Sequence, residues 1–209
     1  MDYKLKMSDI INAKHYNKNS QFQKSVASNV LSYHTFSSDE KILDIGCGDG
    51  EITKLLSING KTTGIDLCSN MINFAKKYNS SVNTYYVNTA ILDFNDTEKY
   101  SLITAFNSIY WCGDLEKVFS KIYNLLYNSG KFLIVTYPKE SPYWLPIVTL
   151  LESNKWNKWK DISITKYWLT TDEYIKSINN SNLNLIQCYT CIEEISYKNS
   201  NEYLDYING

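Results

Sequence analysis

Seven residues of the 209-residue chain, DIGCGDG at positions 44–50, combine three glycines with two acidic side chains at the end of an apolar segment. Glycines let the backbone turn tightly and let a ligand approach closely, because they carry no Cβ atom. The first N–H groups of a helix that follows such a loop favour a polar or anionic ligand. The spacing Gly-x-Gly-x-Gly differs from the Gly-x-Gly-x-x-Gly of dinucleotide-binding loops. The run therefore indicates a ligand-binding loop, with a ligand-free glycine turn as the alternative.

A further acidic residue, Asp66, ends the next apolar segment of the chain. It follows the first glycine by about 20 residues, and an acidic side chain at that distance accepts hydrogen bonds from the hydroxyls of a ribose. Capping of the next helix is the alternative, although Ser69 or Asn70 could do the same. The loop and Asp66 together predict a cofactor that contains a nucleoside.

The elements that must position these residues alternate between apolar segments and helical patterns, which indicates an α/β fold with a parallel sheet. Intervals of roughly 20–30 residues are long enough for crossover helices. Asp114 is predicted to cap the helix that begins at 115, and Asn128-Ser129-Gly130 to form the turn from that helix into the next strand. A capping box from Thr170 to Glu173 predicts a helix to about residue 178. Strands are predicted over 41–46, 61–67, 83–90, 101–107 and 131–137, and one long strand or a strand pair over 183–197. Helices are predicted over 51–57, 70–78 and 115–126, and one or two helices over 8–32, with apolar positions at Ile10, Ile11, Phe22, Val26 and Val30.

The composition is that of an ordinary globular domain, with 44% hydrophobic and 21% charged residues and a net charge of −1. This balance favours neither nucleic acid nor an anionic membrane as a partner. No apolar run is long enough for a signal peptide or a membrane span, so we expect a cytoplasmic protein. We also expect it to be a monomer. The pair Cys188 and Cys191 has no clustered histidine beside it, so no metal site is expected.

Two segments, LDIGCGDG (43–50) and GIDLCSNMINFA (64–75), are very similar to the S-adenosylmethionine (SAM) loops of class I methyltransferases. The resemblance implies a Rossmann-like, mostly parallel sheet flanked by helices, with SAM across the C-terminal ends of the first two strands and S-adenosylhomocysteine (SAH) as the product. It implies a methionine contact from Gly46, Cys47 and Gly48, a ribose contact from Asp66, adenine contacts from Leu67 and Met71, and further cofactor contacts from Asp44, Ala90 and Asn107.

The third predicted strand departs from this family pattern at its end. Thr89 stands where the family usually has an acidic residue that accepts from the adenine amino group. A threonine hydroxyl can accept as well, but more weakly than a carboxylate. We therefore expect a reduced affinity for SAM.

The segment NSIYWCGDL (107–115) after the fourth strand narrows the choice of methyl acceptor. It lacks the Pro-Pro-aromatic run of amino-group methyltransferases, and Asp114 is the single acidic residue available there for a metal. His15 and His34 do not follow a strand end, which leaves a hydroxyl acceptor without a general base. A carboxylate needs no base, because its pKa of about 4 leaves it ionised at neutral pH.

Three longer segments, 13–31, 105–126 and 168–179, resemble malonyl-carrier-protein O-methyltransferases of biotin synthesis. They resemble trans-aconitate and juvenile-hormone-acid methyltransferases less closely. The likeness implies that the N-terminal segment folds over SAM, that Tyr16 closes the site near the methyl group, that Gln23 binds the cofactor and that Trp111 walls the acceptor pocket. The expected substrate is a small carboxylate, possibly carried on an acyl carrier protein.

Arginine, the best residue for holding a free malonyl carboxylate, is missing, since all 21 basic residues are lysines. A lysine from the set Lys155, Lys158 and Lys160 would have to serve. Two other classes stay open. One is a non-catalytic protein of the same fold that acts as an interaction partner, and the other is a nicotinamide-dependent dehydrogenase.

The chain is predicted to form a single SAM-binding domain over 1–209. Residues 1–36 form a helical N-terminal lid, 37–137 the cofactor-binding core, 138–182 an acceptor-side insertion and helix, and 183–209 a C-terminal strand with the start of a helix. Members of the family continue beyond the position of Gly209 with a helix and a seventh, antiparallel strand. We expect that last strand to be missing here.

Overall fold

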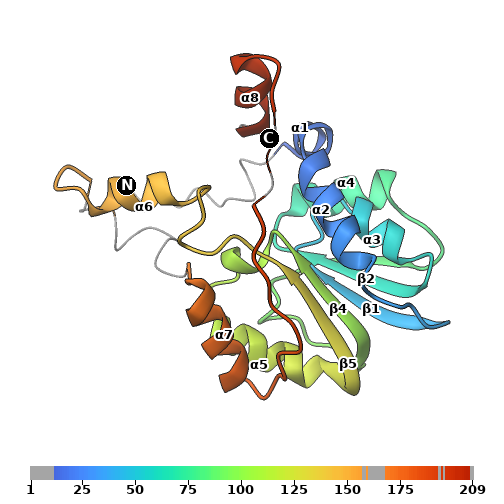
Figure 1. Cartoon of the computed structure of the whole chain (residues 1–209). Helices are drawn as coiled ribbons and strands as arrows, with labels where there is room; N and C mark the ends of the chain where they lie inside the picture. Colours follow the sequence, from blue (N-terminus) through green and yellow to red (C-terminus); the bar gives the residue numbers. More distant parts are fainter. Residues whose placement is uncertain (1–11, 157–158, 160–167, 193, 195, 208–209) are drawn as a thin grey trace, which may run out of the picture.

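Five parallel strands in the order β3-β2-β1-β4-β5 form the core of the computed structural model (Figure 1). The central strands, β1 and β4, are buried almost throughout, as expected for strands covered on both faces. The structure describes residues 12–156, 159, 168–192, 194 and 196–207. The strands are β1 (Glu40–Ile45), β2 (Gly60–Asp66), β3 (Thr84–Asn88), β4 (Tyr100–Phe106) and β5 (Leu126–Val135). The predicted Rossmann-like α/β class is confirmed.

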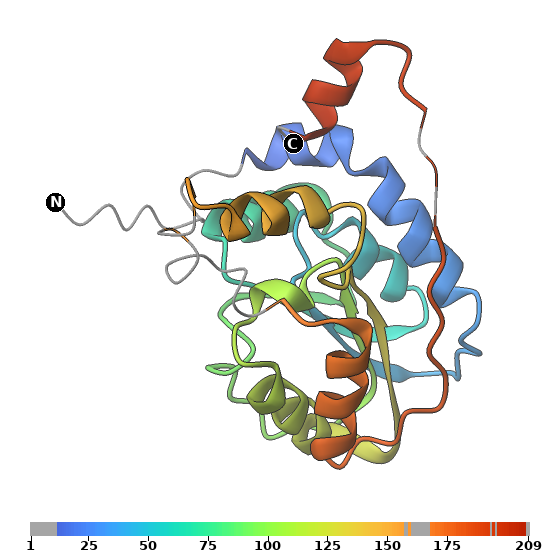
Figure 2. The same cartoon turned by 60° about the vertical axis from the view of Figure 1, so that its left-hand side comes forward.

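Helices cover both faces of this sheet (Figures 1 and 2). On one face, α2 and α3 bury Leu31 and Leu56 against Ile42 and Leu102. On the other face, α5 and α7 enclose the largest apolar cluster of the protein. The helices are α1 (Ala13–Asn19), α2 (Gln21–Leu31), α3 (Glu51–Leu56), α4 (Ser69–Tyr78), the short 3-10 helix η2 (Ile109–Trp111), α5 (Leu115–Leu125), α6 (Leu145–Glu152), α7 (Thr171–Asn180) and α8 (Ser200–Ile207).

Two helix starts follow the predicted capping chemistry. The Asp114 side chain accepts from the Lys117 N–H at the start of α5. Thr170 and Glu173 form the complete capping box of α7. These side chains satisfy N–H groups that a helix leaves without partners at its first turn.

The predicted turn at 128–130 between α5 and the fifth strand is wrong. The helix ends at Leu125 and the strand begins at once, with Asn128, Ser129 and Gly130 inside it. The pairing of β5 with β4 shifts register at this place, from Tyr100 opposite Leu126 to Leu102 opposite Lys131. The polar residues therefore form an irregularity of the strand instead of the turn before it.

The predicted strand over 183–197 is also wrong, because none of its described residues lies in a strand. Leu183 and Leu185 pack against the main apolar cluster, but Ile186 and Ile192 are exposed. A strand needs a hydrogen-bonded neighbour, and this segment runs from α7 to α8 without pairing with the sheet (Figure 2). The described sheet therefore has five strands instead of the six expected.

Candidate functional site

The glycine loop 46–50 leaves β1 and enters α3 with all three of its glycines in the left-handed region, at φ values of 70° (Gly46), 53° (Gly48) and 81° (Gly50). A Cβ atom on Gly46 would lie 2.2 Å from the Ser108 Cβ, and one on Gly50 would lie 2.6 Å from the Ala75 Cβ. These two glycines let the loop pack against the end of β4 and against α4.

Most N–H groups of the loop are occupied within the protein. Those of Gly46 and Cys47 both donate to the Ile65 carbonyl, at 2.8 and 3.0 Å, and that of Gly48 donates to the Asp66 carboxylate at 2.9 Å. The Cys47 side chain is buried in a small apolar cluster. These three N–H groups therefore have partners inside the protein, and the loop offers the bare Cα atom of Gly48 to a ligand.

Asp66 stands at the carboxyl end of β2, as predicted, and its two oxygens accept from the N–H groups of Gly48 (2.9 Å) and Cys68 (2.8 Å). Burial raises the pKa of Asp66, while these two bonds lower it. A carboxylate has about four acceptor positions, so two remain for hydroxyls of a ligand.

Asp44, next to the loop at the end of β1, links α3 to β4 through hydrogen bonds. Its oxygens accept from the hydroxyls of Thr53 on α3 (2.6 Å) and Thr104 on β4 (2.8 Å), and the side chain is buried. Burial raises the pKa of Asp44 to about 6, against the lowering effect of the two hydroxyls. A direct cofactor contact from Asp44 stays a prediction, since the oxygens face the two threonines.

This raised pKa predicts a pH dependence of stability. The folded state holds the Asp44 proton more tightly than the unfolded state, so stability from this group is full below pH 3.8 and is lost as the pH rises through about 6. Between pH 5 and pH 7.5 the loss is about 1.4 kcal/mol. Urea unfolding of wild type and Asp44→Asn at both pH values checks this, because the variant lacks that part of the change. Parallel pH profiles would contradict it.

The other predicted cofactor residues differ in exposure and in hydrogen bonding. Asn107, left-handed at φ 54°, holds a buried Oδ1 with no hydrogen-bond partner among the described residues. Leu67 is 70% exposed beside the loop, whereas Met71 is 3% exposed and packs against Ala13 and Cys68. The Thr89 hydroxyl donates to the Ala90 carbonyl at 3.2 Å and keeps its acceptor capacity.

The N-terminal cap, defined here as α1 and α2, contacts this loop, while its role as a lid over SAM stays a prediction. Tyr16 of α1 stands over Gly48, with its Cε1 atom 3.6 Å from the position of a Cβ there. Burial, followed by the nearby Asp49 and Asp66 carboxylates, raises the pKa of Tyr16, so its hydroxyl stays protonated. Gln23 is half-buried on α2. The buried residues of α2 are Lys24, Ala27 and Leu31, while its apolar Phe22, Val26 and Val30 are half-buried.

A cluster of aromatic rings, called here the aromatic wall, includes Trp111, the residue predicted to line the acceptor pocket. Trp111 on η2 contacts Trp144 and Trp168 edge-on, with ring centroids 6.0 and 6.4 Å apart, and Tyr110 and Tyr137 join the cluster. The indole Nε1 atoms of Trp144 and Trp168 are buried, and neither has a hydrogen-bond partner within the described part of the chain. Trp111 thus lies beside two N–H donors that have no partner among the described residues.

Sequence reasoning did not single out Lys24, Trp144 and Trp168 as site residues. The spacing of Lys24 could have indicated its role. It lies on the same side of the helix as Ala27 and Leu31, and a lysine on a buried side needs polar partners. Trp144 and Trp168 lie in the predicted acceptor-side region 138–182, but nothing in the sequence brings them to Trp111. Lys155 lies over the Trp156 ring at 5.4 Å, and Lys158 and Lys160 lie outside the described residues.

The described residues contain no group of three side chains suited to a metal ion and no helix with the length and apolar character to cross a membrane. They do fit a nucleoside cofactor with an ammonium group. The unpartnered Asn107 Oδ1 can accept from the ammonium, Asp66 from ribose hydroxyls, and Leu67 offers an apolar surface to a base.

Comparison with known proteins agrees with this assignment. Residues 43–134 match the family model described as a methyltransferase domain. Malonyl-[acyl-carrier protein] O-methyltransferase of Acetivibrio thermocellus is 32% identical over 135 residues, which are 60% of this chain and 46% of that protein. Juvenile hormone acid O-methyltransferase of Bombyx mori is 26% identical over 164 residues, 71% of this chain and 58% of that protein.

The fold itself has solved counterparts. The crystal structure of the plantazolicin methyltransferase BpumL with SAH and a substrate analogue superposes with a TM-score of 0.63 at 19% identity, over 94% of this chain and 79% of that one. The chain spans about half the length of the curated relatives it matches.

Proposed function

We propose that this chain, whose residues 43–134 belong to the methyltransferase-domain family of SAM-dependent enzymes, transfers the methyl group of SAM to a carboxylate oxygen of an organic acid. The observation that carries the proposal is the pair of indole donors of Trp144 and Trp168, which lie beside Trp111 and have no hydrogen-bond partner among the described residues. Indole N–H groups can hold a carboxylate where arginine is missing.

The residues of the site suit a reaction that needs no acid or base. SAM supplies a methyl group on a positively charged sulfur, and a carboxylate that accepts it loses no proton. Tyr16 stays protonated, so it can act as a neutral hydrogen-bond donor above Gly48 and next to the aromatic wall. The chain contributes alignment of the two reactants and exclusion of water, which are sufficient for a nucleophile already ionised at neutral pH.

Malonyl-carrier protein is the acceptor that we propose first, as in the Acetivibrio thermocellus relative. The aromatic wall supports a second candidate, an acid with a larger apolar body, as in the Bombyx mori relative. Rings around an acceptor favour apolar surface over a bare dicarboxylate. The two candidates differ in what the rings contact besides the carboxylate.

Mass spectrometry after incubation with SAM distinguishes these acceptors. Malonyl-carrier protein, succinyl-carrier protein, trans-aconitate and an apolar unsaturated fatty acid serve as parallel substrates. We expect a single added methyl on one class, lost in the double variant Trp144→Phe, Trp168→Phe, which keeps the rings and removes both donors. Failure with every acid, from protein that binds SAM, would favour a non-catalytic interaction protein of this fold.

The Tyr16→Phe variant tests the position of Tyr16 between cofactor and acceptor. We expect SAM affinity within about twofold of wild type, because the ring over Gly48 is kept, and a roughly tenfold lower rate of methyl transfer, because a neutral hydroxyl donor is lost (about 1.4 kcal/mol). Calorimetry and single-turnover rates with the active acceptor measure the two effects. An unchanged transfer rate would remove Tyr16 from the acceptor side.

A further inference from the structure

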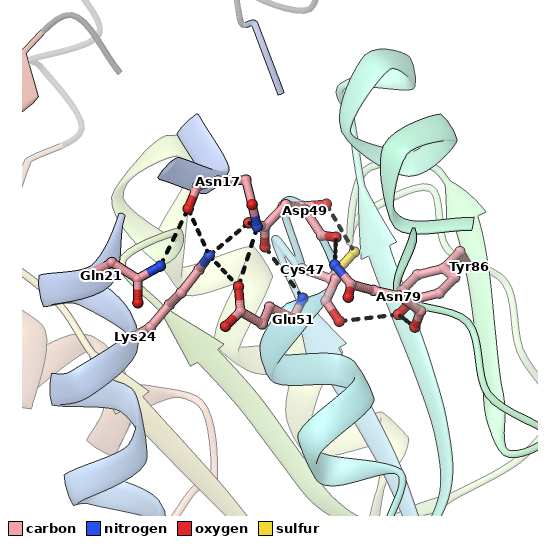
Figure 3. Close-up of polar contacts among 10 residues, drawn as sticks. Asn17, Gln21, Lys24, Cys47, Asp49, Glu51, Asn79 and Tyr86 are labelled. Carbon is pink, nitrogen blue, oxygen red and sulfur yellow. Dashed lines mark hydrogen bonds and ion pairs between the residues drawn. The ribbon is translucent and has the colours of Figure 1, made fainter. Parts of the chain in front are cut away.

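Lys24 occupies an unusual place for a lysine, on the buried side of α2 with 9% of its surface exposed. Its Nζ donates to the Asp49 Oδ2 atom at 2.9 Å, to the Glu51 carboxylate and to the Asn17 carbonyl at 3.2 Å (Figure 3). One ammonium thus joins α2, the end of α1, the glycine loop and the start of α3.

Asn17 reinforces the same contact from α1. Its amide donates to the carboxylates of Asp49, at 2.7 Å, and Glu51, at 3.2 Å (Figure 3). It directly follows Tyr16 in the chain, so the contact fixes the turn of α1 that carries the tyrosine. The cap is therefore held at two points within one turn of Tyr16 and at one point on α2.

Asp49, the loop residue of this contact, is held in place by further hydrogen bonds. The other oxygen of Asp49 accepts from the Glu51 N–H at 3.2 Å, and the Asp49 carbonyl accepts from the Asn79 amide at 2.8 Å. Asp49 is buried, so its carboxylate needs a cationic partner. Removing one member of such a buried pair is costly, because the remaining charge stays buried without compensation.

We propose that Lys24 is a positioning residue that latches the cap onto the glycine loop and thereby holds Tyr16 over Gly48. The inference rests on the proposed function in one respect, namely that the loop binds SAM. While the latch is closed, Tyr16 covers the bare Cα of Gly48, and Ala13 packs on Met71 and Cys68 of the same region. Ligand entry and release therefore require the Lys24 contacts to break.

The test compares Lys24→Met with Lys18→Met. Methionine keeps the length of the lysine chain and removes the charge. Lys18 is an exposed lysine of α1 and makes no ion pair to the described residues, so its loss controls for a charge change on the cap. We expect Lys24→Met to release SAH at least tenfold faster in stopped-flow displacement, and Lys18→Met to stay within twofold of wild type.

Hydrogen exchange of the ligand-free protein gives a readout that does not depend on SAM. In Lys24→Met we expect at least tenfold faster amide exchange across α1 and α2 and unchanged exchange in β1 and β4. A general loss of stability would raise exchange in the strands as well. Unchanged exchange in α1 and α2 would overturn the latch whether or not the protein binds SAM.

A double-mutant comparison identifies the partner. If Lys24 acts through Glu51 and Asp49, Glu51→Gln added to Lys24→Met should speed SAH release by less than twofold more, because the contact is already broken. Additive effects would show that Lys24 acts elsewhere. Absence of SAM binding in wild type, with the exchange result as expected, would refute the proposed function and leave the latch in place.

Discussion

Replacing Gly48 with valine is expected to weaken SAM binding by at least roughly 100-fold, which is about 2.7 kcal/mol. Gly48 has a φ of 53°, where an L-residue is strained by roughly 1–2 kcal/mol and a β-branched one by more. Its Cβ would also project toward Tyr16, whose ring lies 3.6 Å away. The valine methyl groups would then fill the space between loop and cap in which a ligand must lie. Titration calorimetry with SAM measures the loss.

The matched control for this substitution is Gly113→Val. Gly113 has a similar left-handed φ of 84°, but no atom lies within 4 Å of the position of its Cβ. It therefore reproduces the backbone strain without filling the loop. We expect SAM affinity within about threefold of wild type. If Gly48→Val also bound SAM normally, the loop would not be the cofactor site.

Asp66→Ala is expected to weaken SAM binding by roughly 1–3 kcal/mol, since hydrogen bonds to a charged group are lost. The alanine also leaves the N–H groups of Gly48 and Cys68 without their acceptor, which loosens the loop. Equilibrium binding of SAM gives the total effect. The exposed Asp93→Ala serves as the control for loss of a carboxylate near the end of β3.

A ligand with one hydroxyl fewer separates the two contributions of Asp66. If its carboxylate accepts from the ribose, the penalty of Asp66→Ala should be smaller for a 2′-deoxy analogue of SAH than for SAH itself. A loosened loop affects both ligands alike. Equal penalties would assign Asp66 to the loop alone and would leave the ribose without its proposed partner.

Much of the fold was predictable because local patterns and topology agree. The strand ends at Gly46 and Asp66 are marked by glycine and by an acidic residue, and Thr170 and Asp114 mark helix starts. The segment 183–197 has an equally apolar pattern, but a strand also needs a free neighbour in the sheet. Pairing is a property of the whole fold, so the pattern alone could not exclude the unpaired course seen here.

The site was predictable where one short segment carries it and not where distant segments meet. The loop glycines and Asp66 lie within about 20 residues of one another, in the order that a parallel sheet requires. Lys24 reaches Asp49 across 25 residues, and Trp144 reaches Trp168 across a segment outside the strand pattern. Their partners depend on how α2 and the region after β5 pack, which periodicity does not specify.

The hydrogen bonding of the glycine loop also determines which ligands the site rejects. A diphosphate needs several free N–H donors, and the loop has already given those of Gly46, Cys47 and Gly48 to Ile65 and Asp66. The carboxyl groups of Asp44 and Asp66 lie beside it, whereas that of Asp49 is paired with Lys24, and negative charge at this place repels phosphate and attracts a cation. SAM carries a sulfonium charge that SAH has lost. We therefore expect the same surroundings to disfavour a dinucleotide and to favour the methyl donor over its spent product.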